Sequence, residues 1–210
     1  MKNHILAISL GCLVCSTAVL AQDKAEMKPN APMAMSSATT HMDDSSMMSS
    51  KDASKAPYDL QFLDTMEMHH QRAVEMAKLA EDRSEHAELK AMSKKIISDQ
   101  QGEISQMKSW REQWYPGKSQ AMNMDMPGMM DSMKGMSMPK LAASKGKEFD
   151  SMFLDMMIKH HSGAVKMAKS AEAKAQHPEI KDLSKKMVSA QQDEIAQMKK
   201  WKVQWKLAGS

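Results

Sequence analysis

Pairs of adjacent histidines are the feature of this sequence best suited to chemistry. They occur at His69-His70 and again at His160-His161. A neutral imidazole nitrogen is a common transition-metal ligand. The chain also has 26 methionines against three Phe, four Trp and two Tyr, an unusual choice of apolar residue. Because a thioether is a soft ligand that binds without losing a proton, imidazoles and thioethers together favour Cu(I), with Ag(I) as a similar soft ion.

An internal repeat positions these histidines. Segments 59–114 and 150–205 align without a gap, and the two histidine pairs coincide. In each segment apolar residues recur at spacings of three and four, which predicts two helices. His177-Pro178 marks the break between helices in the second copy, since proline suits a first helical position. The predicted helices are 59–82, 86–114, 150–173 and 177–206.

One helical hairpin has too little core to be stable alone, so the two repeats should form one all-α four-helix bundle of the ferritin-like kind. His69 and His70 lie about as far before the first turn as Glu103 lies after it, which places them in one layer. An up-down-up-down order makes the first and third helices parallel and adds the same layer of the second repeat. The predicted metal ligands are Met66, His69, His70, Met76, Glu103, Met107, Met157, His160, His161, Met167, Glu194 and Met198.

A purely structural interpretation of this layer remains open. Each glutamate can hydrogen-bond a neighbouring histidine and fix the helix register without any metal. Met76 and Met167 are equally well explained as core residues, because methionine fills irregular gaps between helices.

Two segments outside the repeats, 22–57 and 116–140, are rich in Met, Ser, Pro and Gly and lack any period. They are expected to be loops or disordered. A segment that builds no core does not need methionine for packing, which favours metal capture over simple cover of apolar surface. The second segment offers Met122, Met124, Met126, Met129, Met130, Met133, Met136 and Met138 as flexible ligands.

The first 21 residues are typical of a signal peptide, with Lys2 before an apolar run and a predicted cleavage after Ala21. Both Cys12 and Cys15 lie in it, so the mature chain should contain no thiolate site. The expected location is the periplasm, with no later membrane span. The expected organisation is signal peptide 1–21, Met-rich segment 22–57, hairpin repeat 58–115, Met-rich linker 116–140 and hairpin repeat 141–210, the two repeats forming one bundle.

The repeat resembles the ferritin-like domain-of-unknown-function family that includes CopM-like periplasmic copper-binding proteins. The resemblance lies in the pattern Phe62, Leu63, Met66, His69, His70, Ala73, Met76, His86, Gln100, Glu103, Ile104 and Met107, which the second copy repeats. It implies a four-helix bundle, an exported location and a role in copper binding and resistance.

The residues and the resemblance together predict a metal binder and not an enzyme. Copper is the expected ligand, with Cu(I) preferred and Cu(II) or Ag(I) also accepted, and another envelope copper-handling protein is a candidate partner. A net charge of +3 with interspersed signs gives no basic stripe for nucleic acid. One alternative is a Met-rich module that binds envelope proteins without metal. A less favoured alternative is a di-iron oxidase, because Glu67 and His70 fit the required motif but Ile158 replaces the glutamate in the second copy.

Overall fold

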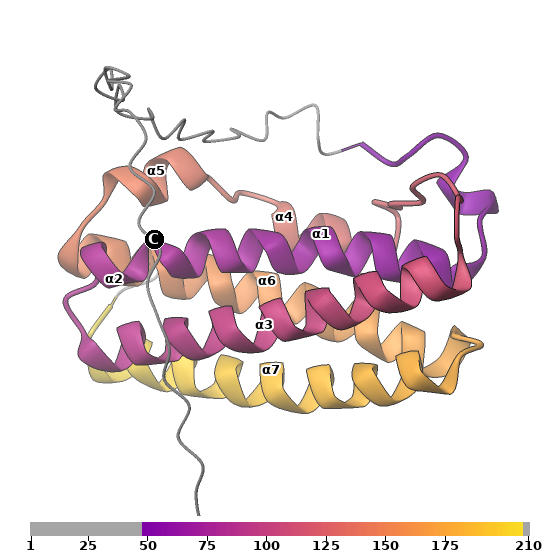
Figure 1. Cartoon of the computed structure of the whole chain (residues 1–210). Helices are drawn as coiled ribbons and strands as arrows, with labels where there is room; N and C mark the ends of the chain where they lie inside the picture. Colours follow the sequence, from indigo (N-terminus) through magenta and orange to yellow (C-terminus); the bar gives the residue numbers. More distant parts are fainter. Residues whose placement is uncertain (1–47, 208–210) are drawn as a thin grey trace, which may run out of the picture. The chain divides into compact units, whose positions relative to one another are not determined.

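Four long helices form the bundle, shown in Figure 1 as a computed structural model. The structure describes residues 48–207, and this range contains no β-strand. The expected signal peptide and most of the first Met-rich segment lie outside the described residues. Within 48–207 no helix is both long and apolar enough to cross a membrane. The elements are η2 Ala53–Lys55, α1 Tyr58–Lys78, α2 Ala80–Arg83, α3 Ala87–Trp114, α4 Met129–Met133, α5 Met138–Ala143, α6 Gly146–Lys174 and α7 Pro178–Gln204.

The buried face of α1 follows the predicted helical period, and the all-α fold class is confirmed. Phe62, Met66, His69, Ala73 and Met76 are all fully buried and recur at spacings of three and four. The first hairpin consists of α1, α2 and α3, and the second consists of α6 and α7. Each hairpin turns immediately before the second of its long helices, close to the predicted positions.

The two hairpins lie antiparallel to each other, so the prediction that the first and third helices are parallel is wrong. Asp59 at the start of α1 accepts a hydrogen bond from His177 at the turn of the second hairpin, with 2.6 Å between Oδ2 and Nδ1. The symmetric contact joins Asp150 at the start of α6 to His86 at the turn of the first hairpin, at 2.5 Å. Figure 1 shows the same opposed directions for α1 and α6.

The connection between the hairpins explains this arrangement. Residues 115–145, here named the crossover, leave the end of α3 and return along the bundle to the opposite end, where α6 begins (Figure 1). The backbone N–H of Ala121 donates to Asp64 Oδ2 at 2.7 Å, and that of Asn123 donates to Thr65 Oγ1 at 2.9 Å. A single long crossover of this kind is the connection found in ferritin-like bundles.

The crossover is folded against the bundle, whereas the sequence predicts loops or disorder for 116–140. It contains α4 and α5, and α4 approaches α6 closely because both contact positions are glycines. A Cβ on Gly163 would lie 2.4 Å from Ser132 Cβ, and one on Gly128 would lie 2.5 Å from the Gly163 carbonyl oxygen. The segment needs no separate hydrophobic core, because its apolar side chains are buried against the apolar surface of the two hairpins.

Candidate metal centre

Four buried histidines meet at the middle of the bundle and are named here the histidine layer: His69, His70, His160 and His161. All four are 0% exposed. The rings of His69 and His160 stack across the two hairpins with centroids 3.6 Å apart and an interplanar angle of 29°. The ring centroids of His69 and His70 are 6.3 Å apart, and those of His160 and His161 are 6.2 Å apart. These nearly equal distances are expected if a pseudo-twofold axis passes through the layer.

A glutamate from the second helix of each hairpin fixes the orientation of the second histidine in that hairpin's pair. His70 Nε2 lies 2.6 Å from Glu103 Oε2, and His161 Nε2 lies 2.9 Å from Glu194 Oε2. Both glutamates were predicted as metal ligands, and the structure places them against imidazoles. A carboxylate that accepts the N–H at one ring position leaves the lone pair at the other, which is how many metal-binding histidines are oriented.

Six ring nitrogens of the layer have no hydrogen-bond partner, which is rare for buried polar atoms. They are Nδ1 and Nε2 of His69 and of His160, and Nδ1 of His70 and of His161. Burial is the main cause that lowers the pKa of His69 well below 6.5, and the nearby His70 and His161 lower it further. Burial also lowers the pKa of His160 well below 6.5, followed by the charges of the other three histidines, while the His69 backbone, which lies outside hydrogen-bond geometry, opposes the shift.

Methionines lie on both sides of the histidine layer in two separate clusters. The first methionine cluster contains Met66, Met107, Met167 and Met187 from the bundle with Met122, Met124, Met126, Met129 and Met133 from the crossover. The second methionine cluster contains Met76, Met156, Met157 and Met198. The prediction that Met66, Met107, Met157 and Met198 share one zone is therefore wrong, since the antiparallel hairpins put each pair on its own side.

The crossover methionines differ in exposure. Five of them are buried in the first methionine cluster, so they act as core residues of the bundle in this state. Met130 is 56% exposed and faces solvent, while Met136 and Met138 are partly buried. The prediction that all eight crossover methionines are flexible ligands does not describe them, because the hydrophobic effect buries some of these side chains and leaves others exposed.

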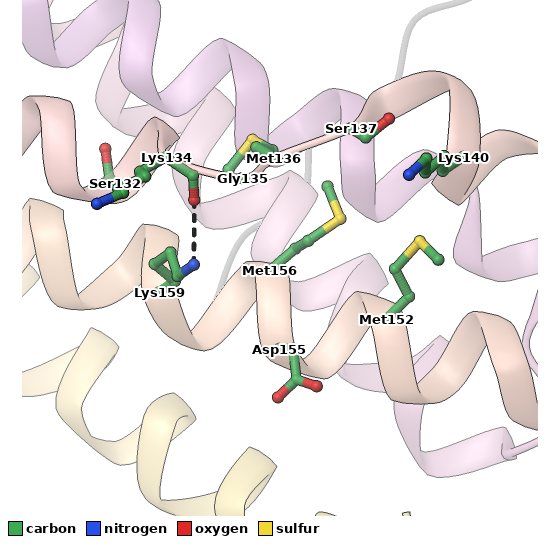
Figure 2. Close-up of a pocket in the computed structure, with 10 residues that line it drawn as sticks. All are labelled: Ser132, Lys134, Gly135, Met136, Ser137, Lys140, Met152, Asp155, Met156 and Lys159. Atoms are coloured by element: carbon green, nitrogen blue, oxygen red, sulfur yellow. Dashed lines mark hydrogen bonds between the residues drawn. The ribbon is translucent and has the colours of Figure 1, made fainter. Parts of the chain in front are cut away.

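A cleft of about 400 Å³ lies between the crossover and α6. Figure 2 shows Met152 and Met156 reaching from α6 toward the crossover, where Met136 lies. Lys159 Nζ donates to the carbonyl oxygen of Lys134 at 3.0 Å and ties the two walls together. Met156 lines the cleft and also belongs to the second methionine cluster, so thioethers extend from the surface toward the interior.

Sequence reasoning missed Met152, Met156 and Met187 as members of these clusters. Met187 lies on the buried face of α7 with Ile180, Ser184 and Gln191, and this period was available as a signal. Met152 and Met156 gain their importance only from the crossover lying above them, which no helical period reveals.

The fold and this centre define a ferritin-like four-helix bundle whose core is lined by imidazoles and thioethers. The chain belongs to the DUF305 family, a domain of unknown function, whose model matches residues 59–202. This confirms the family resemblance of the repeats. No curated protein matches the chain.

Solved structures of other family members resemble this one. CopM in the Cu(I)-bound form is 35% identical, with a TM-score of 0.60, and the match covers 70% of this chain and 96% of that one. CopM in the Cu(II)-bound form is 37% identical, with a TM-score of 0.61 and coverage of 70% and 97%. A candidate secreted DUF305 protein from Streptomyces coelicolor is 28% identical, with a TM-score of 0.64 and coverage of 76% and 99%.

Proposed function

We propose that this protein is an exported, periplasmic copper-binding protein that captures Cu(I) through methionine and histidine side chains and takes part in copper resistance or trafficking. Ag(I) and, at the imidazoles, Cu(II) are further cargo. Support comes from the structural relative CopM, whose structures include Cu(I)-, Cu(II)- and Ag-bound forms. The signal-peptide pattern and the secreted relative support export.

The observation that carries the proposal is the set of six unpaired ring nitrogens in the histidine layer. A buried polar atom without a partner costs roughly 1–3 kcal/mol, and several together are hard to retain without a compensating role. A bound metal supplies that partner for the lone pair, one on each neutral ring. Because the pKa of His69 and of His160 is lowered, their lone pairs stay available at neutral and mildly acidic pH.

The stacking of His69 on His160 favours two sites instead of one. A metal bonded to an imidazole nitrogen lies in the plane of that ring, so two stacked rings present their lone pairs at their edges and do not share an ion between their faces. The further ligands at each edge would be thioethers of one methionine cluster or the Nδ1 atoms of His70 and His161. The pseudo-twofold arrangement predicts that the two sites are alike.

The methionines provide the route to these sites. Met130 is exposed and the cleft methionines Met136 and Met152 are half-buried, so these three are accessible for first capture. Met156 is buried beneath the cleft, and weak thioether binding lets an ion move inward between neighbouring sulfurs. The imidazoles, which are stronger donors, then hold the ion. Local opening of the crossover is the step that admits copper to the first methionine cluster, because five methionines of that segment cover it.

We also propose that the bundle has no enzymatic role. A di-iron centre needs a Glu-x-x-His motif on two helices, and here Glu67 forms a surface ion pair with Lys108 at 3.3 Å. Glu103 is engaged by His70. The carboxylates that would bridge two irons are thus directed to other partners.

The test is a titration of the full chain with Cu(I) against a competing chelator. Replacing His69, His70, His160 and His161 by leucine should lower the affinity by more than roughly tenfold, the loss seen when even a supporting partner of a ligand is removed. The triple variant M66L, M107L, M167L should weaken binding while keeping the fold, since Met and Leu have similar volumes. M92L is the matched control, because the second repeat already has Leu183 at that position.

Unchanged affinity and stoichiometry in the histidine variant would refute this function. A pull-down of envelope proteins with and without a Cu(I) chelator distinguishes copper binding from the alternative function, a protein-interaction module. Partner binding that survives complete removal of copper, together with weak copper binding, would favour a Met-rich interaction module.

A further inference from the structure

The two ends of the bundle carry related but unequal clusters of charged side chains. At each end the histidine that precedes the second helix of one hairpin contacts an aspartate and a tryptophan of the other hairpin. His177 stacks on Trp114 with centroids 3.8 Å apart, and His86 stacks on Trp205 at 3.6 Å. The clusters lie outside the histidine layer and serve to hold the hairpins together.

The cluster around His177 is complete as a structural contact. Asp59 is 1% exposed, and both of its oxygens accept hydrogen bonds. The donors are the backbone N–H of Gln176 at 3.0 and 3.1 Å, the backbone N–H of His177 at 2.9 Å and the His177 Nδ1 at 2.6 Å. This carboxylate needs no further partner.

The cluster around His86 is incomplete. Asp150 is 0% exposed, its Oδ2 accepts from His86 Nδ1 at 2.5 Å and from the Glu85 N–H at 3.3 Å, and its Oδ1 has no partner. The backbone N–H of His86 is diverted to Ser84 Oγ at 3.1 Å. A fully buried carboxylate oxygen without a donor is costly, and its presence needs an explanation.

Two differences between the repeats produce this inequality. Ser84 aligns with Ala175, so only the first repeat has a hydroxyl that removes a donor from the aspartate. Glu85 aligns with Gln176, so only the first repeat adds a second carboxylate. Ligand atoms of Glu85, His86 and Asp150 lie within 4.8 Å of one another.

We propose that Glu85, His86 and Asp150 form a binding site for a divalent cation of borderline softness, Zn(II) or Cu(II). One imidazole and two carboxylates are the ligand set such ions accept, and the ion neutralises two carboxylates that otherwise repel each other. The stack on Trp205 holds the His86 ring in place. Metal–ligand bonds of about 2.0–2.2 Å require a small closing movement, which the exposed Glu85 side chain provides.

Gly146 leaves the space for this glutamate. Its φ is +57°, and a Cβ there would lie 3.2 Å from Glu85 Oε2. Glu85 therefore lies over the first residue of α6, in line with the buried Asp150 one turn further on. The site is separate from the histidine layer and uses no thioether, so it is independent of Cu(I) capture, and either proposal can fail alone.

The experiment is a calorimetric titration of the metal-free full chain with Zn(II), which cannot change oxidation state. The variant E85Q, which copies the second repeat, should lose one Zn(II) equivalent relative to the unmodified chain. E88Q removes the same charge from a nearby exposed position, in the first turn of α3, and should lose none. Circular dichroism should show both variants folded, because Glu85 and Glu88 are exposed.

Equal Zn(II) binding by E85Q and E88Q would overturn the proposal and leave Glu85 with a purely electrostatic role beside α6. The converse variant, A175S with Q176E, transfers both differences to the second repeat and should add one equivalent. Failure to gain it would overturn the claim that these two positions create the site. Cu(I) affinity, measured in parallel, should be unchanged in every variant.

Discussion

The metal-free protein should lose stability as the pH falls below the usual histidine range, because of His69 and His160. Burial is the main cause that lowers the pKa of each ring well below 6.5 in the folded state. In the unfolded chain both rings take up protons near pH 6.5. Between that value and the lowered pKa of the folded state, the unfolded chain binds more protons, so the free energy of unfolding decreases as the pH decreases.

The size of this effect follows from the number of rings involved. A group that is fully protonated only in the unfolded state changes the free energy of unfolding by about 1.4 kcal/mol per pH unit. Two such rings give a slope of roughly 2.7 kcal/mol per pH unit, reached about one unit below pH 6.5. Because domains of this kind have only about 5–15 kcal/mol of stability in total, one pH unit removes a substantial part of it.

Urea unfolding, followed by circular dichroism in the presence of a metal chelator, measures this slope between about pH 7 and about pH 5. The variant H69L with H160L should show a shallower slope in this window, because it lacks the two rings whose pKa burial lowers in the folded state. An identical slope in the unmodified chain and in the variant would refute the reasoning, whatever the absolute stabilities.

Two further predictions concern the crossover. D64A removes the acceptor of Arg111 Nε at 2.6 Å and of the Ala121 N–H at 2.7 Å, so proteolysis within 116–128 should accelerate while helix content is kept; equal cleavage rates would contradict this. G163A should destabilise the protein by about 1–3 kcal/mol, because its Cβ would overlap the crossover, whereas G102A, with nothing within 4 Å, should be neutral or stabilising in the same urea assay.

The bundle itself was predictable from the sequence because the buried residues of each helix recur at helical spacing. Phe62, Met66 and His69 recur at helical spacing, and the repeat shows the same period twice. The pairing of His70 with Glu103 was also accessible, since both lie at matching distances from the hairpin turn. Both inferences depend only on local geometry along one hairpin.

The relative direction of the hairpins was not predictable by the same means. Either order buries the same apolar faces, and the choice depends on the path taken by 115–145. That path is set by particular contacts, such as Asp64 with Ala121 and Gly128 with Gly163, which join residues far apart in the sequence. Composition suggested disorder for the segment because composition does not register the apolar surface available on neighbouring helices.

The direction of the hairpins also decides what the centre can do. Parallel hairpins would place all four histidines beside one set of methionines and would favour a single mixed site. In the antiparallel arrangement His69 and His160 meet on the pseudo-twofold axis, and each methionine cluster combines residues of both repeats, as Met66 does with Met167. The main difference between the two sides is their cover, since the buried crossover methionines all belong to the first cluster. Two chemically similar sites with unequal access should therefore fill at different rates but with similar affinities, a pattern that a single mixed site does not produce.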